Sequence, residues 1–474
     1  MLHSPQRLKG MMDVSPEVVA FRRGVGETLQ RFLAKYGYRQ IEVPILEETE
    51  LLLRKSGGEL ASKMYTFTDP GGHRVSLRPE FPSSVVRAYL ETMPHAGQPV
   101  RLSYMGPVFR YELEESVGQR QFTQIGAEII GSDSAWADTE LLAMAGRGIS
   151  ELGIHDWTLV VGDLGFIGLL LESMNLSDRA RMFILASLTE LGQRKDSIEK
   201  VKACAAGLGL IEDGAHGRMA ETELPNEAGV AILERYLQTN STSTIGVRTP
   251  QEIRERFLRK QLLSQNSGQL EDAIELVAQI AQTRGKPQEA LGLVRNLIDS
   301  KPALERLDKL EMTLQSLTQY GLNTECILDF GLGRGIAYYT GIVFEIIHPS
   351  LGDVSLGGGG RYDGLIQALG GTNSTPAMGF AWTLDHVIEL LLNEKSGKSQ
   401  RQISDIVLVR PTDGSDFGKV VAEAERLRDQ GTLVELDLSG SSLEQSLKYG
   451  RARGICKIVS VDSDGKVTTA DVPE

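Results

Sequence analysis

Apolar and polar positions from 6 to 131 follow two different periods. Between Val18 and Tyr36 the apolar residues recur at helical spacing, which predicts an amphipathic helix. GYRQIEVPIL at 37–46 is apolar enough for a strand. MYTFTDPGGHRVSLRPE at 64–80 is typical of two strands joined by a turn at DPGG. We therefore expect an antiparallel sheet here, with helices packed on one face.

The pattern changes twice further along the chain. From 132 to 323 most apolar residues fall at helical spacing, so we expect a mainly helical region, part of it an insertion. Strand signals return from Thr324, in ECILDFGLG, YYTGIVFEIIHP and VSLGGGGRYDGLI. Segments 1–131 and 324–392 should then form one α+β core. After the linker NEKSGKSQRQ, residues 404–474 alternate strands and helices, which predicts a small α/β domain.

Composition and net charge exclude some classes of function. The chain has 474 residues, 41% of them hydrophobic and 24% charged, as is usual for a globular protein with real cores. A net charge of −13 argues against a chain that coats nucleic acid non-specifically. Without an apolar run of about 18 residues or a secretory signal at the start, we expect a cytoplasmic protein that does not contact a membrane.

Cysteines and histidines give no metal signal. The three cysteines are widely separated and lack CxxC or Cys/His spacing, so neither a disulfide framework nor a zinc site is indicated. The seven histidines are scattered singly. We therefore expect no metal and no cofactor.

Polar residues alternate along QFTQIGAEIIG at 121–131. If this segment is a strand, Gln124 and Glu128 share a face and could hold an ammonium or an imidazole group. Arg110, before the intervening loop, could hold an anion. An ordinary hairpin with a solvated polar face fits the same pattern.

A second candidate group lies in GLGRGIAYYTGIVFEI at 331–346. Glycine allows a ligand to approach the backbone, Arg334 can pair with a carboxylate or phosphate, and Tyr338 and Tyr339 offer rings and hydroxyls. A glycine-rich turn with core tyrosines is the alternative. GGGG at 357–360 lacks the lysine of a P-loop and is expected to allow tight backbone packing beside the pocket.

Eight motifs follow one another along the chain: KGMMDVSPE, YGYRQIEVPIL, KMYTFTDPGGHRVSLRPE, GPVFRYE, RQFTQIGAEIIG, GRGIAYYTGIVFE, GGGGRYDGL and TPAMGFAW. Taken together and in this order, they resemble the catalytic core of histidyl-tRNA synthetase and of its paralogue, the regulatory subunit of ATP phosphoribosyltransferase. The resemblance covers about 1–131 and 324–392. It implies the six-stranded antiparallel sheet of class II aminoacyl-tRNA synthetases with flanking helices, and dimerisation through the segment around Pro44.

The resemblance also implies a histidine-binding pocket. The matching positions, with the adjacent tyrosine, are Glu80, Arg110, Gln124, Glu128, Arg334, Tyr338 and Tyr339. The carboxylates and the amide among these side chains can accept hydrogen bonds from the ammonium and imidazole groups of histidine. The arginines can pair with a carboxylate or a phosphate. Pro82 replaces the threonine that usually follows this motif, which removes one hydroxyl.

The ATP side departs from the synthetase pattern. His386 occupies the position of the arginine that holds the γ-phosphate, Thr383 replaces a glycine, and Gly118 replaces a basic residue in the motif 2 loop. In that loop Leu113 replaces another basic residue, and the acids at 114 and 115 add negative charge. A neutral histidine has neither the permanent positive charge of arginine nor its paired N–H donors. We therefore expect adenylate formation to be lost, and we name no catalytic residue.

These departures favour a non-catalytic regulatory subunit of ATP phosphoribosyltransferase, in the first step of histidine biosynthesis. We expect it to bind L-histidine for feedback control and to act as a homodimer within a hetero-oligomer with the short-form catalytic subunit. No concentrated basic or base-reading set is visible in 404–474, so tRNA binding is not expected. The alternatives are a divergent histidyl-tRNA synthetase, favoured by the complete pocket, and a related protein that binds another amino acid or partner.

Overall fold

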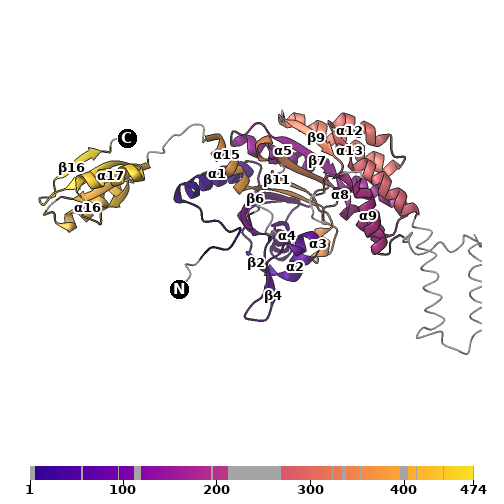
Figure 1. Cartoon of the computed structure of the whole chain (residues 1–474), viewed down its shortest axis with the longest axis horizontal. Helices are drawn as coiled ribbons and strands as arrows, with labels where there is room; N and C mark the ends of the chain where they lie inside the picture. The colour runs from indigo at the N-terminus through magenta and orange to yellow at the C-terminus, as the bar shows by residue number, and fades with distance from the viewer. Residues whose placement is uncertain are drawn as a thin grey trace, which may run out of the picture. The chain divides into compact units, whose positions relative to one another are not determined.

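The chain forms two compact units, Met1–Leu391 and Leu392–Glu474. Each is described by itself, from a computed structural model shown in Figure 1. Every helix within the described residues is too short or too polar to span a lipid bilayer. The structure describes residues 6–54, 57–93, 95–111, 119–193, 196–211, 268–322, 324–333, 338–352, 354–395, 404–412, 414–440 and 442–472.

A nine-stranded sheet forms the centre of the first unit, in the order β1-β5-β6-β12-β11-β10-β7-β9-β8. Its strands are β1 (Arg39–Gln40), β5 (Val100–Phe109), β6 (Gln121–Ile130), β7 (Thr158–Asp163), β8 (Arg284–Gly285), β9 (Glu325–Asp329), β10 (Ile342–Ile347), β11 (Ser355–Arg361) and β12 (Ala377–Thr383). From β5 across to β7 every neighbouring pair is antiparallel. The parallel pairs β1–β5 and β7–β9 extend this centre. The predicted α+β fold with an antiparallel core sheet is confirmed.

The region 132–323 is less purely helical than the apolar spacing predicts. It contributes β7 and β8 to the sheet, and β7 lies between β10 and β9. The β7 sequence TLVVGD is buried along almost its whole length. A strand covered on both faces shows no alternation of apolar and polar residues, so periodicity cannot separate it from a helix. The core sheet therefore extends beyond 1–131 and 324–392.

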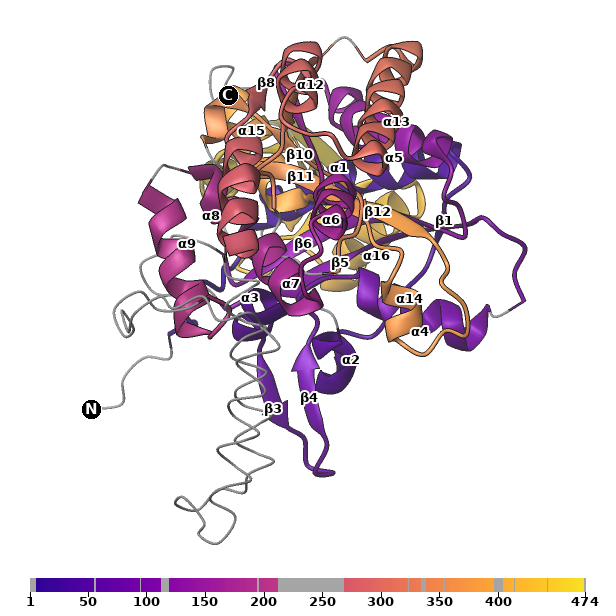
Figure 2. The ribbon, with the colours of Figure 1, turned by 90° about the vertical axis from the view of Figure 1, so that its right-hand side faces the viewer.

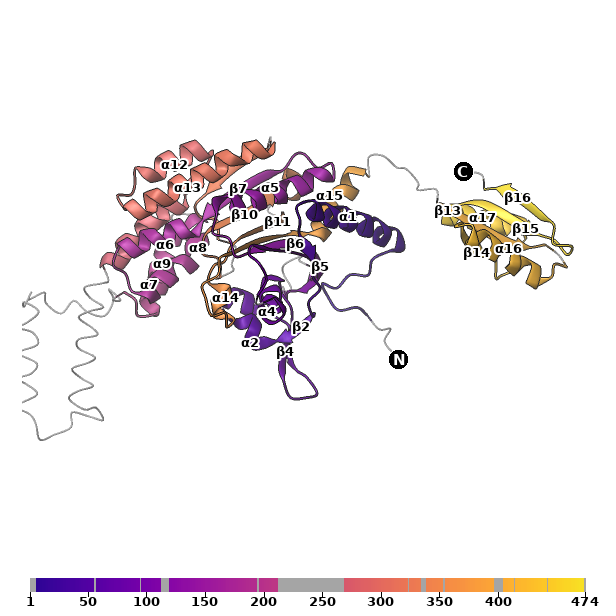
Figure 3. The ribbon, with the colours of Figure 1, turned by 180° about the vertical axis from the view of Figure 1, so that it is seen from behind.

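Helices cover both faces of this sheet (Figures 1 and 3). Helices α1, α5 and α15 lie on one face, and α4 and α14 lie on the other. The helices of the first unit are α1 (Pro16–Lys35), α2 (Thr49–Leu53), α3 (Gly57–Ser62), α4 (Pro82–Thr92), α5 (Ala135–Glu151), α6 (Leu164–Ser173), α7 (Asp178–Ala186), α8 (Leu188–Gln193), α9 (Asp196–Gly207), α12 (Pro287–Arg295), α13 (Lys301–Leu317), α14 (Leu365–Ala368) and α15 (Leu384–Lys395). Residues 268–281 are also helical, and 3₁₀ turns occupy Thr318–Tyr320 and Pro349–Leu351.

The helix expected at 18–36 forms as α1, and its sequence explains its limits. Proline at the first turn and an acid beside it favour the start, because they suit the unpaired amides and the positive end of the helix dipole. Leu29, Phe32 and Leu33 are buried, at the spacing of one helix face. Gly37 follows with a positive φ of 79°, which glycine adopts without strain, and the helix ends there.

Small residues in α5 let that helix approach the sheet closely. The indole of Trp382 on β12 donates to the carbonyl of Ala145 at 2.8 Å and is fully buried. A methyl group added at Gly148 would overlap the Trp382 ring. The glycine in this helix therefore makes room for the largest side chain of the core, in exchange for a small loss of helix propensity.

A smaller sheet, β2-β4-β3, carries the predicted hairpin, which projects from the first unit in Figure 2. Its strands are β2 (Leu46–Glu48), β3 (Thr66–Thr68) and β4 (Arg74–Leu77). The turn closes through the Asp69 carboxylate, which accepts the amide of His73 at 2.8 Å. Gly72 in this turn has a φ of 87°. The Asp-Pro-Gly-Gly sequence thus supplies both the acceptor and the left-handed residue that the turn needs.

The second unit is a doubly wound α/β domain, as the sequence predicts for 404–474. Its sheet has the order β14-β13-β15-β16. The elements are β13 (Ser404–Pro411), α16 (Phe417–Asp429), β14 (Leu433–Leu436), α17 (Leu443–Arg453), β15 (Ile455–Val461) and β16 (Val467–Asp471). Val420 and Ala424 of α16 pack on one face of the sheet, whereas Leu447 of α17 packs on the other.

Candidate active site

Strand register places the candidate residues of β6 on one face of the core sheet. Gln124, Gly126 and Glu128 alternate onto the same side, as predicted from the sequence. Their partners on β12 are Thr383, Ala381 and Gly379 respectively, and Tyr104 on β5 lies opposite Gly126. Helix α4 covers this face, because its apolar residues pack on the even-numbered residues of β5.

Glu128 is the most deeply buried acid of this face. It is 0% exposed, and each carboxylate oxygen accepts a hydrogen bond from a tyrosine. The Tyr104 hydroxyl donates to Oε1 at 2.8 Å, and the Tyr362 hydroxyl donates to Oε2. Burial raises the pKa of Glu128 to about 8, the two phenols act in the opposite direction, and the charge of Glu80 raises it further.

Glu80 is the second buried acid, with 3% of its surface exposed. Its Oε2 accepts the Tyr338 hydroxyl at 2.8 Å, and its Oε1 accepts the amide of Ser83 at 3.2 Å. That amide is one of the unpaired groups at the start of α4, so the acid also satisfies a helix terminus. Burial raises the pKa of Glu80, while these hydrogen bonds and the charge of Arg110 lower it.

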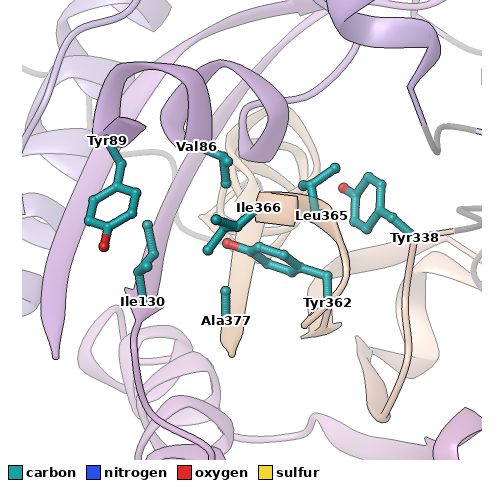
Figure 4. Packing of buried hydrophobic residues seen from close by; sticks show 8 residues of the cluster. All are labelled: Val86, Tyr89, Ile130, Tyr338, Tyr362, Leu365, Ile366 and Ala377. Carbon is teal, nitrogen blue, oxygen red and sulfur yellow. The ribbon is translucent and has the colours of Figure 1, made fainter. Parts of the chain in front are cut away.

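Tyrosines join the two acids into one cluster, which we call the acid–tyrosine pocket: Glu80, Glu128, Tyr104, Tyr338 and Tyr362. The Tyr338 and Tyr362 rings meet edge to face, with centroids 5.7 Å apart. Figure 4 shows both rings packed with Leu365 and Ile366, beside Val86 and Tyr89 of α4. Burial raises the pKa of each of the three phenols well above its usual value. They therefore stay protonated and donate.

Packing that involves Phe81 and Arg78 fixes the position of the Tyr104 ring. Its ring lies parallel to that of Phe81, with centroids 4.1 Å apart, and the guanidinium of Arg78 lies 4.0 Å from the centroid of Phe81. Arg78 is itself buried and donates to the carbonyls of Pro107 and Val43 at 2.9 and 2.7 Å. Arg78 thus packs on Phe81, and Phe81 packs on Tyr104, so the Tyr104 hydroxyl is held in place.

Three of the other residues predicted for the site lie around the acid–tyrosine pocket: Tyr339, Arg110 and Gln124. Tyr339 packs against Tyr338, with centroids 5.0 Å apart. Arg110 donates through Nε to the carbonyl of Pro79 at 2.9 Å, and its guanidinium lies 5.2 Å from the centroid of Phe122. Gln124 lies one alternation beyond Gly126 on β6. Arg334 and Gly118, with Leu113 and the acids at 114 and 115, fall outside the described residues.

The residues at the end of β12, which we call the β12 exit, are Thr383, Asp385 and His386. Nδ1 of His386 lies 2.8 Å from the carbonyl oxygen of Ser355, so that nitrogen carries the proton and donates. Asp385 accepts Nη1 of Arg22 at 2.6 Å and the amide of Thr123 at 2.7 Å. Both side chains therefore form hydrogen bonds within the protein. Neither supplies a fixed positive charge at the position where the synthetase motif has arginine.

A cavity of about 1680 Å³ borders Tyr339, which packs against Tyr338 of the acid–tyrosine pocket. Tyr339, Arg306 and Arg361 contribute to its wall, but the buried Glu80 and Glu128 do not. Arg306 pairs with Asp163 at 2.7 Å, and Arg361 pairs with Asp138 and also, at 2.9 Å, with Asp363. Pockets for small ligands usually measure roughly 300–1,000 Å³, so this cavity offers room for more than one amino acid.

Two further observations concern the ligands that the site can hold. Among the described residues no three His, Cys, Asp or Glu side chains lie together as a metal site would require. A methyl group added at Gly126 would lie 2.5 Å from the Tyr104 hydroxyl oxygen, and one at Gly360 would lie 2.9 Å from the Tyr339 ring. At both positions the atom nearest to the added methyl group is a backbone carbonyl oxygen, that of Phe380 or that of Ile342. These glycines therefore allow close packing of neighbouring strands, as expected for GGGG at 357–360.

The antiparallel core sheet, the buried acids on one of its faces and the small α/β unit define a class II aminoacyl-tRNA synthetase-like protein. The pattern of the histidyl-tRNA synthetase family matches residues 10–240 and 251–387, which is most of the sequence. The chain therefore belongs to the histidyl-tRNA synthetase family.

Relatives and solved structures agree with this assignment. The chain is 32% identical to the histidine–tRNA ligase of Pyrococcus furiosus over 98% of its own length and 94% of that protein, and 30% identical to that of Methanocaldococcus jannaschii over 98% and 95%. Its fold resembles the ATP phosphoribosyltransferase regulatory subunit/histidyl-tRNA synthetase of Bacillus halodurans, with a TM-score of 0.67 and 20% identity over 97% and 100% of the two chains. It also resembles apo histidyl-tRNA synthetase of Staphylococcus aureus, with a TM-score of 0.59 and 21% identity over 100% and 98%.

Sequence reasoning missed two residues of the pocket, Tyr104 and Tyr362. Tyr104 stands in VRLSYMGPVF, and its place opposite Gly126 follows only from the β5–β6 register. Tyr362 directly follows β11, where the motif RYDG was used for the resemblance and not for its phenol. The register of the glycine-containing strands is the signal that could have found both.

Proposed function

We propose that this chain is a histidine–tRNA ligase, which activates L-histidine with ATP and transfers it to tRNA. The observation that carries the proposal is the acid–tyrosine pocket, in which Glu128 and Glu80 are buried with tyrosine donors beside them. Two buried acids suit a ligand with two groups that donate N–H bonds, such as the imidazole and ammonium of histidine. The similarity along nearly the whole chain to relatives named histidine–tRNA ligase supports the same function.

Each residue has a role in this proposal. Glu128 accepts a ring N–H of the imidazole, with Tyr104 and Tyr362 holding its carboxylate in place. Glu80 and Gln124 hold the ammonium group, while Arg334 holds the carboxylate of histidine. Arg110, which lies over Phe122, faces the α-phosphate of ATP as the carboxylate oxygen attacks it. The attack forms histidyl adenylate and releases pyrophosphate.

The test is histidine-dependent exchange of pyrophosphate into ATP, followed by charging of histidine tRNA with purified protein. We expect exchange with L-histidine and none with L-phenylalanine, which matches histidine in shape but has no ring N–H. Exchange that is absent while histidine still binds in calorimetry would reject the ligase and leave the pocket as a binding site.

A second candidate function is the regulatory subunit of ATP phosphoribosyltransferase, and the β12 exit favours it. His386 and Thr383 replace an arginine and a glycine of the synthetase motif, and His386 is bound to the carbonyl of Ser355. In 404–474 there are 13 Asp and Glu against 9 Lys and Arg, which does not favour binding to an anticodon. In this role L-histidine would bind the same pocket and change the activity of a short-form catalytic subunit.

One comparison separates the two candidates. The chain is mixed with a short-form ATP phosphoribosyltransferase, and the formation of phosphoribosyl-ATP is followed with and without histidine. Histidine-sensitive activation without pyrophosphate exchange would establish the regulatory subunit, and exchange without activation would establish the ligase. If the chain shows neither and does not bind histidine, both proposals fail.

In either role we propose a homodimer through the segment around Pro44. Beside that proline Ile45 and Leu46 are each 42% exposed, and Phe67 on the hairpin is 47% exposed. Large apolar side chains at neighbouring surface positions are typical of an interface between protein chains. Sedimentation of the purified chain tests this, with a dimer expected and a monomer at micromolar concentration as the contrary result.

A further inference from the structure

Gly379 on β12 lies directly against the carboxylate of Glu128. It is the register partner of Glu128 on β6. A methyl group built at Gly379 would overlap the carboxylate carbon and Oε2, and would lie 2.7 Å from Oε1. The three atoms nearest to that position all belong to this one carboxyl group, so the absence of a side chain at 379 leaves the space that the carboxylate occupies.

Gly357 and Gly162 of the same sheet have a different environment. A methyl group at Gly357 would meet the carbonyl of Ala381 at 2.6 Å and the backbone of Trp382. At Gly162 the nearest atom would be the carbonyl of Asp329, at 2.8 Å. At these positions glycine serves the packing of one strand or loop against another. At Gly379 it serves the placement of a single functional side chain.

The position of the carboxylate decides which partners it has. Tyr104 reaches Oε1 from β5 on one side, and Tyr362 reaches Oε2 from the segment after β11 on the other. Both phenols are held by packing, Tyr104 on Phe81 and Tyr362 against Tyr338. A carboxylate pushed away from β12 would lose at least one of these donors, because the rings cannot follow it.

We propose that Gly379 is a positioning residue for histidine binding, because it lets the Glu128 carboxylate lie against β12 between the Tyr104 and Tyr362 hydroxyls. This inference rests on the proposed binding of histidine, and it applies to the ligase and to the regulatory subunit alike. It assigns to Gly379 an effect that acts through Glu128 and requires no contact with the ligand.

The experiment is a double-mutant cycle read by calorimetric titration with L-histidine. Gly379→Ala should weaken binding by roughly tenfold or more, the loss expected when a buried polar group loses its hydrogen-bond partners. Glu128→Asp shortens the acid by one methylene and opens the space that the new methyl group needs. In that background Gly379→Ala should change the affinity by less than about twofold, because two residues that act through one contact are not additive.

Several outcomes decide the matter. An equal loss in both backgrounds, or unchanged binding by Gly379→Ala, would overturn the inference while the proposed function stands. No histidine binding by the unsubstituted protein would overturn the proposed function and this inference together. If Gly379→Ala alone does not fold, a double variant that folds and binds like Glu128→Asp supports the inference, and a double variant that also fails to fold overturns it. Gly292→Ala, in α12 with nothing within 4 Å, is the control for the substitution itself.

Discussion

The acid–tyrosine pocket includes Glu128, whose register partner on β12 is Gly379, and the β12 exit begins at Thr383, four residues further along the same strand. The two regions differ in how their charged groups are paired. In the pocket, Glu128 and Glu80 are buried and their oxygens are met by phenols that also pack as core residues. At the β12 exit, His386 and Asp385 are bound to a backbone carbonyl and to Arg22. In the pocket the acids are thus surrounded by hydrogen-bond donors of the core. At the exit, the described cation is Arg22, and it is paired with Asp385 rather than carried by residue 386.

This difference teaches that residues in two neighbouring regions of one sheet face can be under different structural constraints. The pocket needs a low-polarity interior around its acids, and α4, β5 and β11 supply it as part of the core. Loss of the pocket would therefore also damage packing. A residue at the start of α15 carries no such constraint, because its replacement changes only local contacts.

His386→Arg sharpens the comparison most. If the missing cation limits the ligase, arginine at this position should raise histidine-dependent pyrophosphate exchange by roughly 10²–10³-fold, the usual effect of one preorganised charge on a transition state. Binding of histidine should not change, because the pocket lies elsewhere on the face. The assay compares initial exchange rates, and His73→Arg on the exposed hairpin serves as the control. An exchange rate equal to that of the control would show that the β12 exit is not what separates this chain from an efficient ligase.

Glu128→Ala should weaken histidine binding strongly. The variant removes the acid that faces the imidazole and leaves two buried phenols without an acceptor, at a cost of about 1–3 kcal/mol, or roughly 5–150-fold in affinity. Calorimetry measures it directly. Glu151→Ala, at an exposed ion pair with Lys35, is the matched control. Near-unchanged affinity would mean that Glu128 does not hold the ligand.

The pH dependence of stability tests the burial of Glu128 without any ligand. Its pKa is raised to about 8 in the folded chain, above the usual value of 4.5, so folding takes up a proton between these values. The contribution is fully present below about pH 4.5 and is lost as the pH rises through 8, by at most about 1.4 kcal/mol per unit. Glu128→Gln should therefore lose less stability than the unsubstituted protein between pH 6 and 8. Denaturant unfolding at several pH values measures this, and parallel curves would contradict the assignment.

The sequence predicts the pocket better than it predicts the sheet that carries it. Glu80, Glu128 and Tyr338 stand in motifs whose chemistry is visible in the residue types. The strand character of β6 follows from alternation, so the common face of Gln124 and Glu128 is also predictable. Strand β7 is not predicted, because a strand buried on both faces shows no alternation of apolar and polar residues. The partnership of Tyr104 with Glu128 escapes because it depends on the register between two strands, which short-range patterns do not specify.

The smallest effects concern single hydroxyls of the acid–tyrosine pocket. Tyr104→Phe keeps the stack on Phe81 but removes the donor to Oε1 of Glu128. One such hydrogen bond is worth about 0.5–1.5 kcal/mol, so histidine affinity should fall by roughly 2–13-fold. The matched control is Tyr449→Phe, which removes a similar tyrosine–glutamate bond of 2.9 Å at the surface of the second unit. Equal affinities for the two variants would mean that the phenol is a packing residue only, and the contrast between the pocket and the β12 exit would then rest on the acids alone.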